Sequence, residues 1–218
     1  MYFKSRAAAG DVLAAQIAKK YRHKPCVAIA LSDGAVMVAA QIALELHCPL
    51  TMLLTDEIQL PRENTAIGGI AQDGSFAYNG AYSNSEIDEL VSEYHGIIEQ
   101  EKMTKMQEMH RLEGRGGLIK RKLLRERTVI LVSDGLSNGF ALDLASEYLK
   151  TIKVRRLVVA TPLASVAAVD RMHILADEIY CLSVIEDYIT TDHYYETQDV
   201  PSHEVIVRTI EEIVRRWK

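Results

Sequence analysis

Residues 128–139 read TVILVSDGLSNG, and this stretch decides the fold that we expect for the chain. Residues 129–132 are apolar and β-prone, which predicts a short buried strand. Small and polar residues follow at 133–139, and helical spacing begins at Phe140. The backbone N–H groups of such a loop converge, and a helix N-terminus adds about half a positive charge. The segment therefore predicts a strand, an anion-binding loop and a helix, in that order.

Alternating strands and helices on both sides of this stretch predict a doubly wound α/β fold with a parallel sheet. Continuous apolar runs suit strands that are covered on both faces, and each strand–helix–strand unit implies a right-handed crossover. Ser5 is expected to cap the first helix and Ser202 the last. The other expected strands are residues 26–31, 50–54, 156–160 and 178–182, and the other expected helices run from the loop 32–35 to about residue 46, over 140–150 and over 166–175.

The middle of the chain departs from this alternation and predicts an insertion at about residues 58–117. Two apolar runs flank residues 72–74 (QDG), which is a hairpin signal. Residues 85–112 then have the periodicity of one long helix. Because no repeat or low-complexity linker divides the chain, we expect residues 1–218 to form a single domain.

The composition excludes several classes of protein. Of the 218 residues, 48% are hydrophobic and 25% charged, as in an ordinary globular protein. The formal net charge of −5 argues against a general nucleic-acid binder, whose affinity would rest on a basic surface. Cys26, Cys48 and Cys181 lie far apart in apolar runs, so we expect reduced, buried thiols and no zinc site. No apolar run is long enough for a membrane span or a signal peptide, and we expect a cytoplasmic protein.

The glycine loop can be interpreted as the nucleophile elbow of a serine hydrolase. Residues 135–139 match G-x-S-x-G between a strand and a helix, which would make Ser137 the nucleophile. Against this, Ser133 and Asp134 separate the strand from the first glycine, and no HGGG-like segment precedes the motif. The remaining triad members would come from Asp170, Asp177 or Asp192 and from His193 or His203.

The same loop, with its acid included, resembles the phosphoribosyl diphosphate (PRPP) loop of type I phosphoribosyltransferases. In that family the loop amides hold the 5′-phosphate, and paired acids accept hydrogen bonds from the ribose 2′- and 3′-hydroxyls. A vicinal diol suits carboxylate acceptors, and a phosphate suits a ring of N–H donors. The resemblance implies that Asp134 is the catalytic residue and that phosphate and ribose are bound by Ser133, Asp134, Gly135, Leu136, Ser137, Asn138 and Gly139.

The resemblance extends along nearly the whole chain and is closest to a bacterial branch of predicted phosphoribosyltransferases. Segments similar to those of that branch occur in matching order, and 31–38 (LSDGAVMV) resembles its pyrophosphate loop. The implied pyrophosphate loop consists of Ser32, Asp33, Gly34 and Ala35. The other similar segments are 3–13 (FKSRAAAGDVL), 64–70 (NTAIGGI), 73–74, 128–139, 160–166 (ATPLASV), 176–182 (ADEIYCL) and 203–205.

The chain departs from the family pattern at residues that bear the chemistry, so its PRPP motif is degenerate. Ser133 stands at the first acid, and Asn138 stands in the hydroxyl position, where its amide still provides an N–H donor. Acids replace the expected cations at Asp33 and at residues 56–57 (DE). Each such carboxylate costs about a few kcal/mol against PRPP, unless Mg²⁺ or another cation offsets it.

Other charged and aromatic segments leave alternatives open. The basic residues around 111–127 either fold over a diphosphate or form a solvated charge run. Residues 192–195 (DHYY) form either a hood over a heterocycle or an ordinary packed loop. His110 and His173 lie on helical stretches and are interpreted as packing or surface residues. The basic residues are Arg115, Lys120, Arg121, Lys122, Arg125 and Arg127.

Three functions follow from these observations. The first is an active phosphoribosyltransferase that uses Mg²⁺, and the second is an inactive relative that binds or regulates. The third is the serine hydrolase. For the first two we expect a small phosphorylated ligand (PRPP, ribose 5-phosphate or a nucleotide), no nucleic-acid or membrane partner and no metal site formed by the protein alone. A methionine row on the long helix (Met103, Met106, Met109) and the family both suggest a homodimer.

Overall fold

A computed structural model of the chain describes all residues except 1, 62, 64, 114–120, 199 and 217–218. Its central sheet has five parallel strands in the order β2-β1-β6-β7-β8, which confirms the doubly wound α/β fold. Apolar side chains fill β1 and β6 almost completely, because helices cover both faces of the sheet. The strands are β1 (Cys26–Ala30), β2 (Leu50–Met52), β6 (Thr128–Val132), β7 (Arg156–Ser165) and β8 (Glu178–Ile185).

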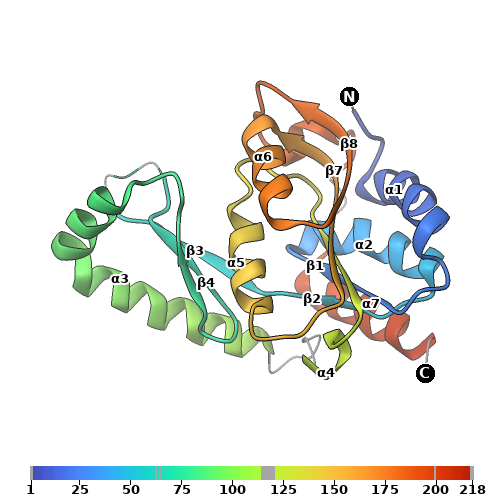
Figure 1. Cartoon of the computed structure of the whole chain (residues 1–218), viewed down its shortest axis with the longest axis horizontal. Helices are drawn as coiled ribbons and strands as arrows, with labels where there is room; N and C mark the ends of the chain where they lie inside the picture. Colours follow the sequence, from blue (N-terminus) through green and yellow to red (C-terminus); the bar gives the residue numbers. More distant parts are fainter. Residues whose placement is uncertain (1, 62, 64, 114–120, 199, 217–218) are drawn as a thin grey trace.

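Helices form a layer on each face of this sheet (Figure 1). Ala28 and Ala30 of β1 pack into the core under α1, α2 and α7, whereas Val27 and Ile29 pack into the core under α5 and α6. This alternation follows from the period of two in a strand. The helices are α1 (Arg6–Tyr21), α2 (Asp33–Leu46), α5 (Phe140–Leu149), α6 (Val166–Leu175) and α7 (His203–Arg216), with α4 (Arg121–Leu124) before β6.

The predicted hairpin and long helix form a lobe that projects from the sheet (Figure 1). The strands β3 (Thr55–Ile58), β4 (Gly68–Ala71) and β5 (Phe76–Tyr78) make an antiparallel sheet, with α3 (Asn84–Glu113) packed against it. The hairpin between β4 and β5 was predicted. Strand β3 was not, because its charged residues lack the alternation that marks a strand. The methionines of α3 do not share one environment, since Met109 is buried and Met103 is 65% exposed.

The ends of two strands differ from the prediction. Strand β7 continues beyond Ala160 to Ser165, and β8 reaches Ile185. We expected this strand to end at residue 160, yet Leu163 pairs with Ser183 beyond that point. The loop after β6 supports this extension, because Leu136 N–H donates to the Leu163 carbonyl at 3.0 Å. The extended end of β7 therefore lies against the glycine loop and is hydrogen-bonded to it.

No helix in the described part of the chain is both long and apolar enough to cross a membrane.

Candidate functional site

The two loops singled out in the sequence meet at the point where the chain reverses direction across the sheet. From β1 the chain crosses to β2 on one side, and from β6 it crosses to β7 on the other. The carboxyl ends of two such neighbouring strands diverge and leave a crevice, the usual ligand site of open α/β sheets. Residues 32–35 follow β1, and residues 133–139 follow β6. The topology therefore brings the two loops together.

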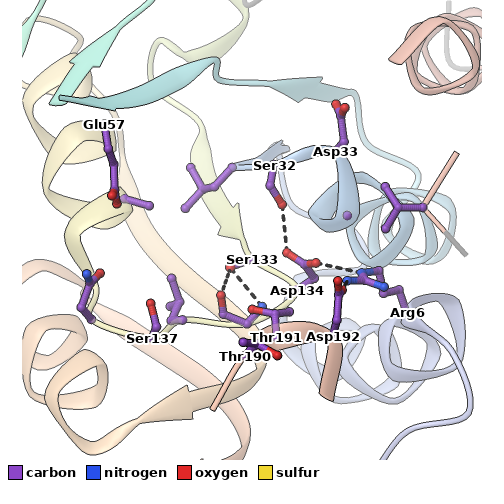
Figure 2. Close-up of a pocket in the computed structure, with 17 residues that line it drawn as sticks. Arg6, Ser32, Asp33, Glu57, Ser133, Asp134, Ser137, Thr190, Thr191 and Asp192 are labelled. Atoms are coloured by element: carbon purple, nitrogen blue, oxygen red, sulfur yellow. Dashed lines mark hydrogen bonds and ion pairs between the residues drawn. The ribbon is translucent and has the colours of Figure 1, made fainter. Parts of the chain in front are cut away.

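A cavity of about 460 Å³ lies between these loops (Figure 2). The start of α2 forms one wall, and a short 3₁₀ helix, η1 (Thr191–Tyr194), contributes to another. Its volume lies within the range of small-molecule pockets, about 300–1,000 Å³. The lining residues are Arg6, Leu31, Ser32, Asp33, Gly34, Glu57, Ser133, Asp134, Gly135, Leu136, Ser137, Asn138, Ala141, Thr190, Thr191, Asp192 and Val200.

Asp134 is held from two sides (Figure 2). The Ser32 hydroxyl donates to Oδ1 at 2.9 Å, and Arg6 Nε donates to Oδ2 at 2.8 Å. Arg6 Nη2 also donates to Asp192 Oδ1. Burial alone lowers the pKa of the Arg6 guanidinium, but its hydrogen bonds to the two carboxylates raise the pKa above its ordinary value. Arg6 therefore stays charged and joins two acids of the cavity.

Sequence reasoning did not assign a role to Arg6. In the sequence analysis, Arg6 appears only within the segment 3–13 that resembles the family. One signal was present, because Arg6 lies on the same helical face as Ala9 and Leu13, which are fully buried. Arg6 itself is 2% exposed. A charged residue on a buried helix face requires a partner, and that partner is Asp134.

Several polar groups of the glycine loop form hydrogen bonds with neighbouring residues of the same segment. The Ser133 hydroxyl donates to the Gly135 carbonyl at 3.0 Å and accepts from the Gly135 N–H at 3.2 Å. Asn138 Oδ1 accepts from the N–H of Phe140, the first residue of α5, at 3.0 Å and so closes a side-chain turn just before the helix. Gly139 has a φ of +76°, a conformation that favours glycine. Ser133 thus shapes the turn and does not replace the missing acid.

The predicted pyrophosphate loop caps α2 and packs tightly on Asp134. Ser32 Oγ accepts from the Ala35 N–H at 3.0 Å. A Cβ on Gly34 would lie 2.2 Å from Asp134 Oδ2, so only glycine fits there. The Asp33 carboxylate points away from Asp134 (Figure 2) and lies 3.0 Å from His203 Nδ1. The Asp33 side chain therefore contacts α7 and not the acid of the glycine loop.

The acids after β2 lie in different surroundings. Asp56 Oδ2 lies 3.1 Å from Lys105 Nζ on α3. Glu57 lines the cavity, and Figure 2 shows its side chain directed toward the glycine loop. Burial, followed by the charge of Asp56, raises the pKa of Glu57 above its ordinary value. Of the two acids, Glu57 is the one whose side chain lines the cavity.

Of the two alternatives for residues 192–195, a hood over a heterocycle is found only in part. Asp192 lines the cavity, but Tyr194 and Tyr195 are buried against Phe3. The Tyr195 hydroxyl donates to the Asp134 carbonyl at 2.6 Å, and its ring lies under the Arg6 guanidinium at 4.6 Å. The two tyrosines are therefore packed beside the site and do not line the cavity. The alternative of an ordinary packed loop describes them better than a hood.

The described contacts assemble no catalytic triad at Ser137. His193 Nε2 lies 3.0 Å from the Tyr2 hydroxyl, and the imidazole of His203 contacts Asp33. Among the candidate acids, Asp177 accepts from the Leu157 N–H at 2.8 Å. His110 and His173 are exposed on α3 and α6, as expected for surface residues.

The basic segment contributes no described residue to the cavity. Arg115 and Lys120 lie outside the described residues. Arg121 is bound to Asp73 at 2.6 Å. The remaining three, Lys122, Arg125 and Arg127, do not line the cavity either. In the part of the chain that the structure covers, no three His, Cys, Asp or Glu side chains converge as a metal site.

Comparisons with known proteins find similar sequences and structures. A family model described as phosphoribosyl transferase domain matches residues 3–204. A protein of Mycobacterium tuberculosis strain H37Rv, named as an inferred phosphoribosyl transferase, is 27% identical over 183 residues, which cover 83% of this chain and 40% of the relative. A protein of strain CDC 1551, named in the same way, gives the same figures. The chain thus spans about 40% of the length of the curated relatives that it matches.

Two solved structures share the fold. The crystal structure of TT1426 from Thermus thermophilus aligns with 100% of this chain and 99% of its own, at 25% identity and a TM-score of 0.72. A hypothetical protein from Neisseria gonorrhoeae with bound ppGpp aligns over 95% of each chain, at 11% identity and a TM-score of 0.50. The second likeness is one of fold alone.

Proposed function

Because this chain belongs to the phosphoribosyl transferase domain family, we propose that its cavity binds a 5-phosphoribosyl ligand. The 5′-phosphate lies against the backbone N–H groups of residues 137–139 and the start of α5, where the helix dipole favours an anion. The N–H groups of Gly135 and Leu136 already donate to acceptors of the protein. The Asn138 side chain keeps its Nδ2 donor for this phosphate, since its Oδ1 accepts from the Phe140 N–H. The ribose hydroxyls donate to Asp134.

One observation carries this proposal: Asp134 lies two residues after the end of the central strand β6, and two donors orient it in the cavity. It is 7% exposed, yet it lines the cavity beside the glycine loop. A carboxylate held in this way is an acceptor of fixed orientation, which suits a pair of sugar hydroxyls. The arrangement supports recognition of ribose 5-phosphate or a nucleoside monophosphate.

Transfer from PRPP is the second candidate function, and family membership favours it. The described side chains of the cavity include four carboxylates and one guanidinium, and that guanidinium is bound to two of the acids. A diphosphate therefore finds little positive charge among them. In an active enzyme, Mg²⁺ would depend on the phosphate oxygens of the ligand for part of its coordination. This charge balance supports binding without transfer as the first proposal.

Thermal unfolding with matched ligands distinguishes the two. We expect ribose 5-phosphate at millimolar concentration to raise the melting temperature, because a ligand that binds only the native state stabilises it. PRPP with Mg²⁺ should then give no larger shift. A clearly larger, Mg²⁺-dependent shift with PRPP would favour the transferase instead. The absence of any shift with both ligands would contradict a 5-phosphoribosyl site.

The homodimer also remains a proposal. Ile97 and Met103 of α3 are 39% and 65% exposed, and such apolar side chains suit a contact between copies. Sedimentation velocity of the wild type and of Met103→Glu tests it. We expect the wild type to sediment as a dimer and the variant to dissociate more readily, whereas a monomeric wild type would contradict the proposal.

A further inference from the structure

We propose that Arg6 is the positioning residue that makes the site selective for a sugar with two adjacent hydroxyls. The inference rests on the proposed function, since it concerns the ribose end of the same cavity. Arg6 does not touch the ligand in this proposal. It acts through Asp134, whose carboxylate it orients.

The first step is a count of acceptor positions on Asp134. A carboxylate has about four lone-pair positions. Arg6 Nε occupies one on Oδ2, and the Ser32 hydroxyl occupies one on Oδ1. Each oxygen therefore retains one acceptor position, and the pair of positions matches two hydroxyl donors on adjacent carbons. These two positions are the acceptors that we assign to the hydroxyls of the ligand.

The second step is the rigidity of the guanidinium. Nε and Nη2 of Arg6 bind two different acids, Asp134 and Asp192, so the planar group is fixed at both ends. Its Cζ also lies 4.6 Å from the centre of the Tyr195 ring. The Tyr195 hydroxyl in turn donates to the Asp134 backbone carbonyl at 2.6 Å. Arg6 thus controls the side chain of Asp134, while Tyr195 controls its backbone.

The third step is the anchoring of Arg6 itself. The Phe3 N–H donates to the Tyr194 carbonyl at 2.9 Å, and the Glu196 N–H donates to the Phe3 carbonyl at 2.9 Å. This short ladder joins the segment before α1 to the segment after η1. Ser5 caps α1 by accepting from the Ala8 N–H at 3.1 Å. Arg6 therefore starts from a backbone that is fixed on both sides.

A lysine in place of Arg6 retains the charge but lacks the planar fork. Its single ammonium group cannot satisfy both acids with the same geometry, so Asp134 loses its fixed orientation. The ligand that depends on this orientation is the diol, whereas inorganic phosphate depends on the loop amides. The substitution should therefore reduce discrimination between sugars and leave phosphate binding largely intact.

Isothermal titration calorimetry of the whole chain with ribose 5-phosphate, 2-deoxyribose 5-phosphate and inorganic phosphate tests this. We expect the wild type to prefer ribose 5-phosphate over its 2-deoxy analogue by at least tenfold. Arg6→Lys should reduce that ratio to within about twofold and change phosphate affinity by less than twofold. Arg22→Lys is the matched control, because Arg22 is exposed and bound to Glu45, and it should keep the wild-type ratio.

Three results overturn the inference: an unchanged ratio in Arg6→Lys, an equal loss of affinity for all three ligands, or a wild type that binds both sugars equally. The last leaves the proposed phosphate site standing, whereas a wild type that binds none of the three contradicts the proposed function as well. If Arg6→Lys does not fold, Asp192→Asn serves as the second variant. The Asp192 side chain is 64% exposed, so its substitution should leave the fold intact. Asp192→Asn should lower the ratio at least threefold, and an unchanged ratio would again overturn the inference.

Discussion

Arg6 Nε donates to Asp134 Oδ2 at 2.8 Å, across 128 residues of sequence. This contact links the first turn of α1 to the loop after the central strand β6. Breaking such a buried pair by removing one partner costs about 3–5 kcal/mol, because the other charge is left without compensation. The same contact that stabilises the fold therefore orients the acid of the candidate site, and stability and ligand binding should respond together to changes around it.

Gly34→Ala should displace Asp134. The new Cβ would lie 2.2 Å from Asp134 Oδ2 and 2.8 Å from Arg6 Nε, so the ion pair must shift. We expect a destabilisation of about 1–3 kcal/mol from overpacking. Ribose 5-phosphate affinity should fall at least tenfold, as measured by calorimetry.

Gly96→Ala is the matched control for that change. No atom lies within 4 Å of a Cβ at Gly96, which is in the middle of α3. Alanine there should stabilise the protein by about 0.5–1 kcal/mol and leave ligand affinity unchanged. Equal ligand affinity in Gly34→Ala and the wild type would contradict the close packing that we describe.

Tyr195→Phe should weaken the support behind the loop. It removes the hydroxyl that donates to the buried Asp134 carbonyl at 2.6 Å and leaves the ring in place. We expect a loss of about 1–3 kcal/mol in the free energy of unfolding, because a buried acceptor is left unsatisfied. Urea denaturation measures this loss. Tyr2→Phe is a useful control, since the Tyr2 side chain is exposed and its substitution should cost less than about 1 kcal/mol.

Glu178 should make stability depend on pH in the acidic range. Burial raises its pKa, but hydrogen bonds from Lys20, Tyr180 and Tyr21 outweigh this and lower the pKa to about 2. The pKa in the folded state is thus lower than the ordinary value of 4.5. The stabilisation is therefore fully present above about pH 4.5 and is lost as the pH falls toward 2, at about 1–3 kcal/mol.

Urea denaturation of the wild type and Glu178→Gln at several pH values checks this expectation. The difference in stability between the two should be largest at pH 6–7 and should shrink as the pH falls below 4.5. The exposed Glu212→Gln should show little difference from the wild type at any pH. A difference for Glu178→Gln that stays constant with pH would show that its carboxylate charge does not stabilise the fold.

Two of the cysteines should be inert in the native protein. Burial raises the pKa of Cys26 to about 11 and that of Cys48 to about 12, so few thiolates form near neutral pH. Each is 2% exposed. Mass spectrometry after iodoacetamide treatment at pH 7.5 should find both unmodified, with complete modification after unfolding in guanidinium. Rapid native labelling of Cys48 would contradict its burial.

Much of the fold follows from local patterns in the sequence. Apolar runs predicted β1 and β6, and the DG signal at 73–74 predicted the hairpin. Strand β3 was not predicted, because Asp56 and Glu57 are charged and give no apolar strand pattern. Pairing with β4, rather than burial, makes that segment a strand. The predicted strand 156–160 was too short, because hydrogen bonds with Leu136 support β7 beyond Ala160.

The candidate site was predictable only in part. Strand order explains why residues 32–35 and 133–139 meet, and that order is implied by a doubly wound sheet. The roles of Arg6 and Tyr195 were not predictable, since both depend on contacts between segments far apart in the chain. The neutralisation of Asp56 by Lys105 likewise depends on how α3 packs against β3. Counting charges along the sequence therefore did not show that, of Asp56 and Glu57, only Glu57 lines the cavity.

Calorimetry of ribose 5-phosphate binding to the wild type and to Asp134→Asn tests the central claim most directly. Asparagine keeps the size of the side chain but replaces one acceptor oxygen with a donor, so it cannot accept hydrogen bonds from both hydroxyls of a diol. We predict saturable binding at one site of the wild type and at least a tenfold loss in Asp134→Asn, with inorganic phosphate affinity largely kept. No binding to the wild type, or equal binding to both proteins, would contradict the account.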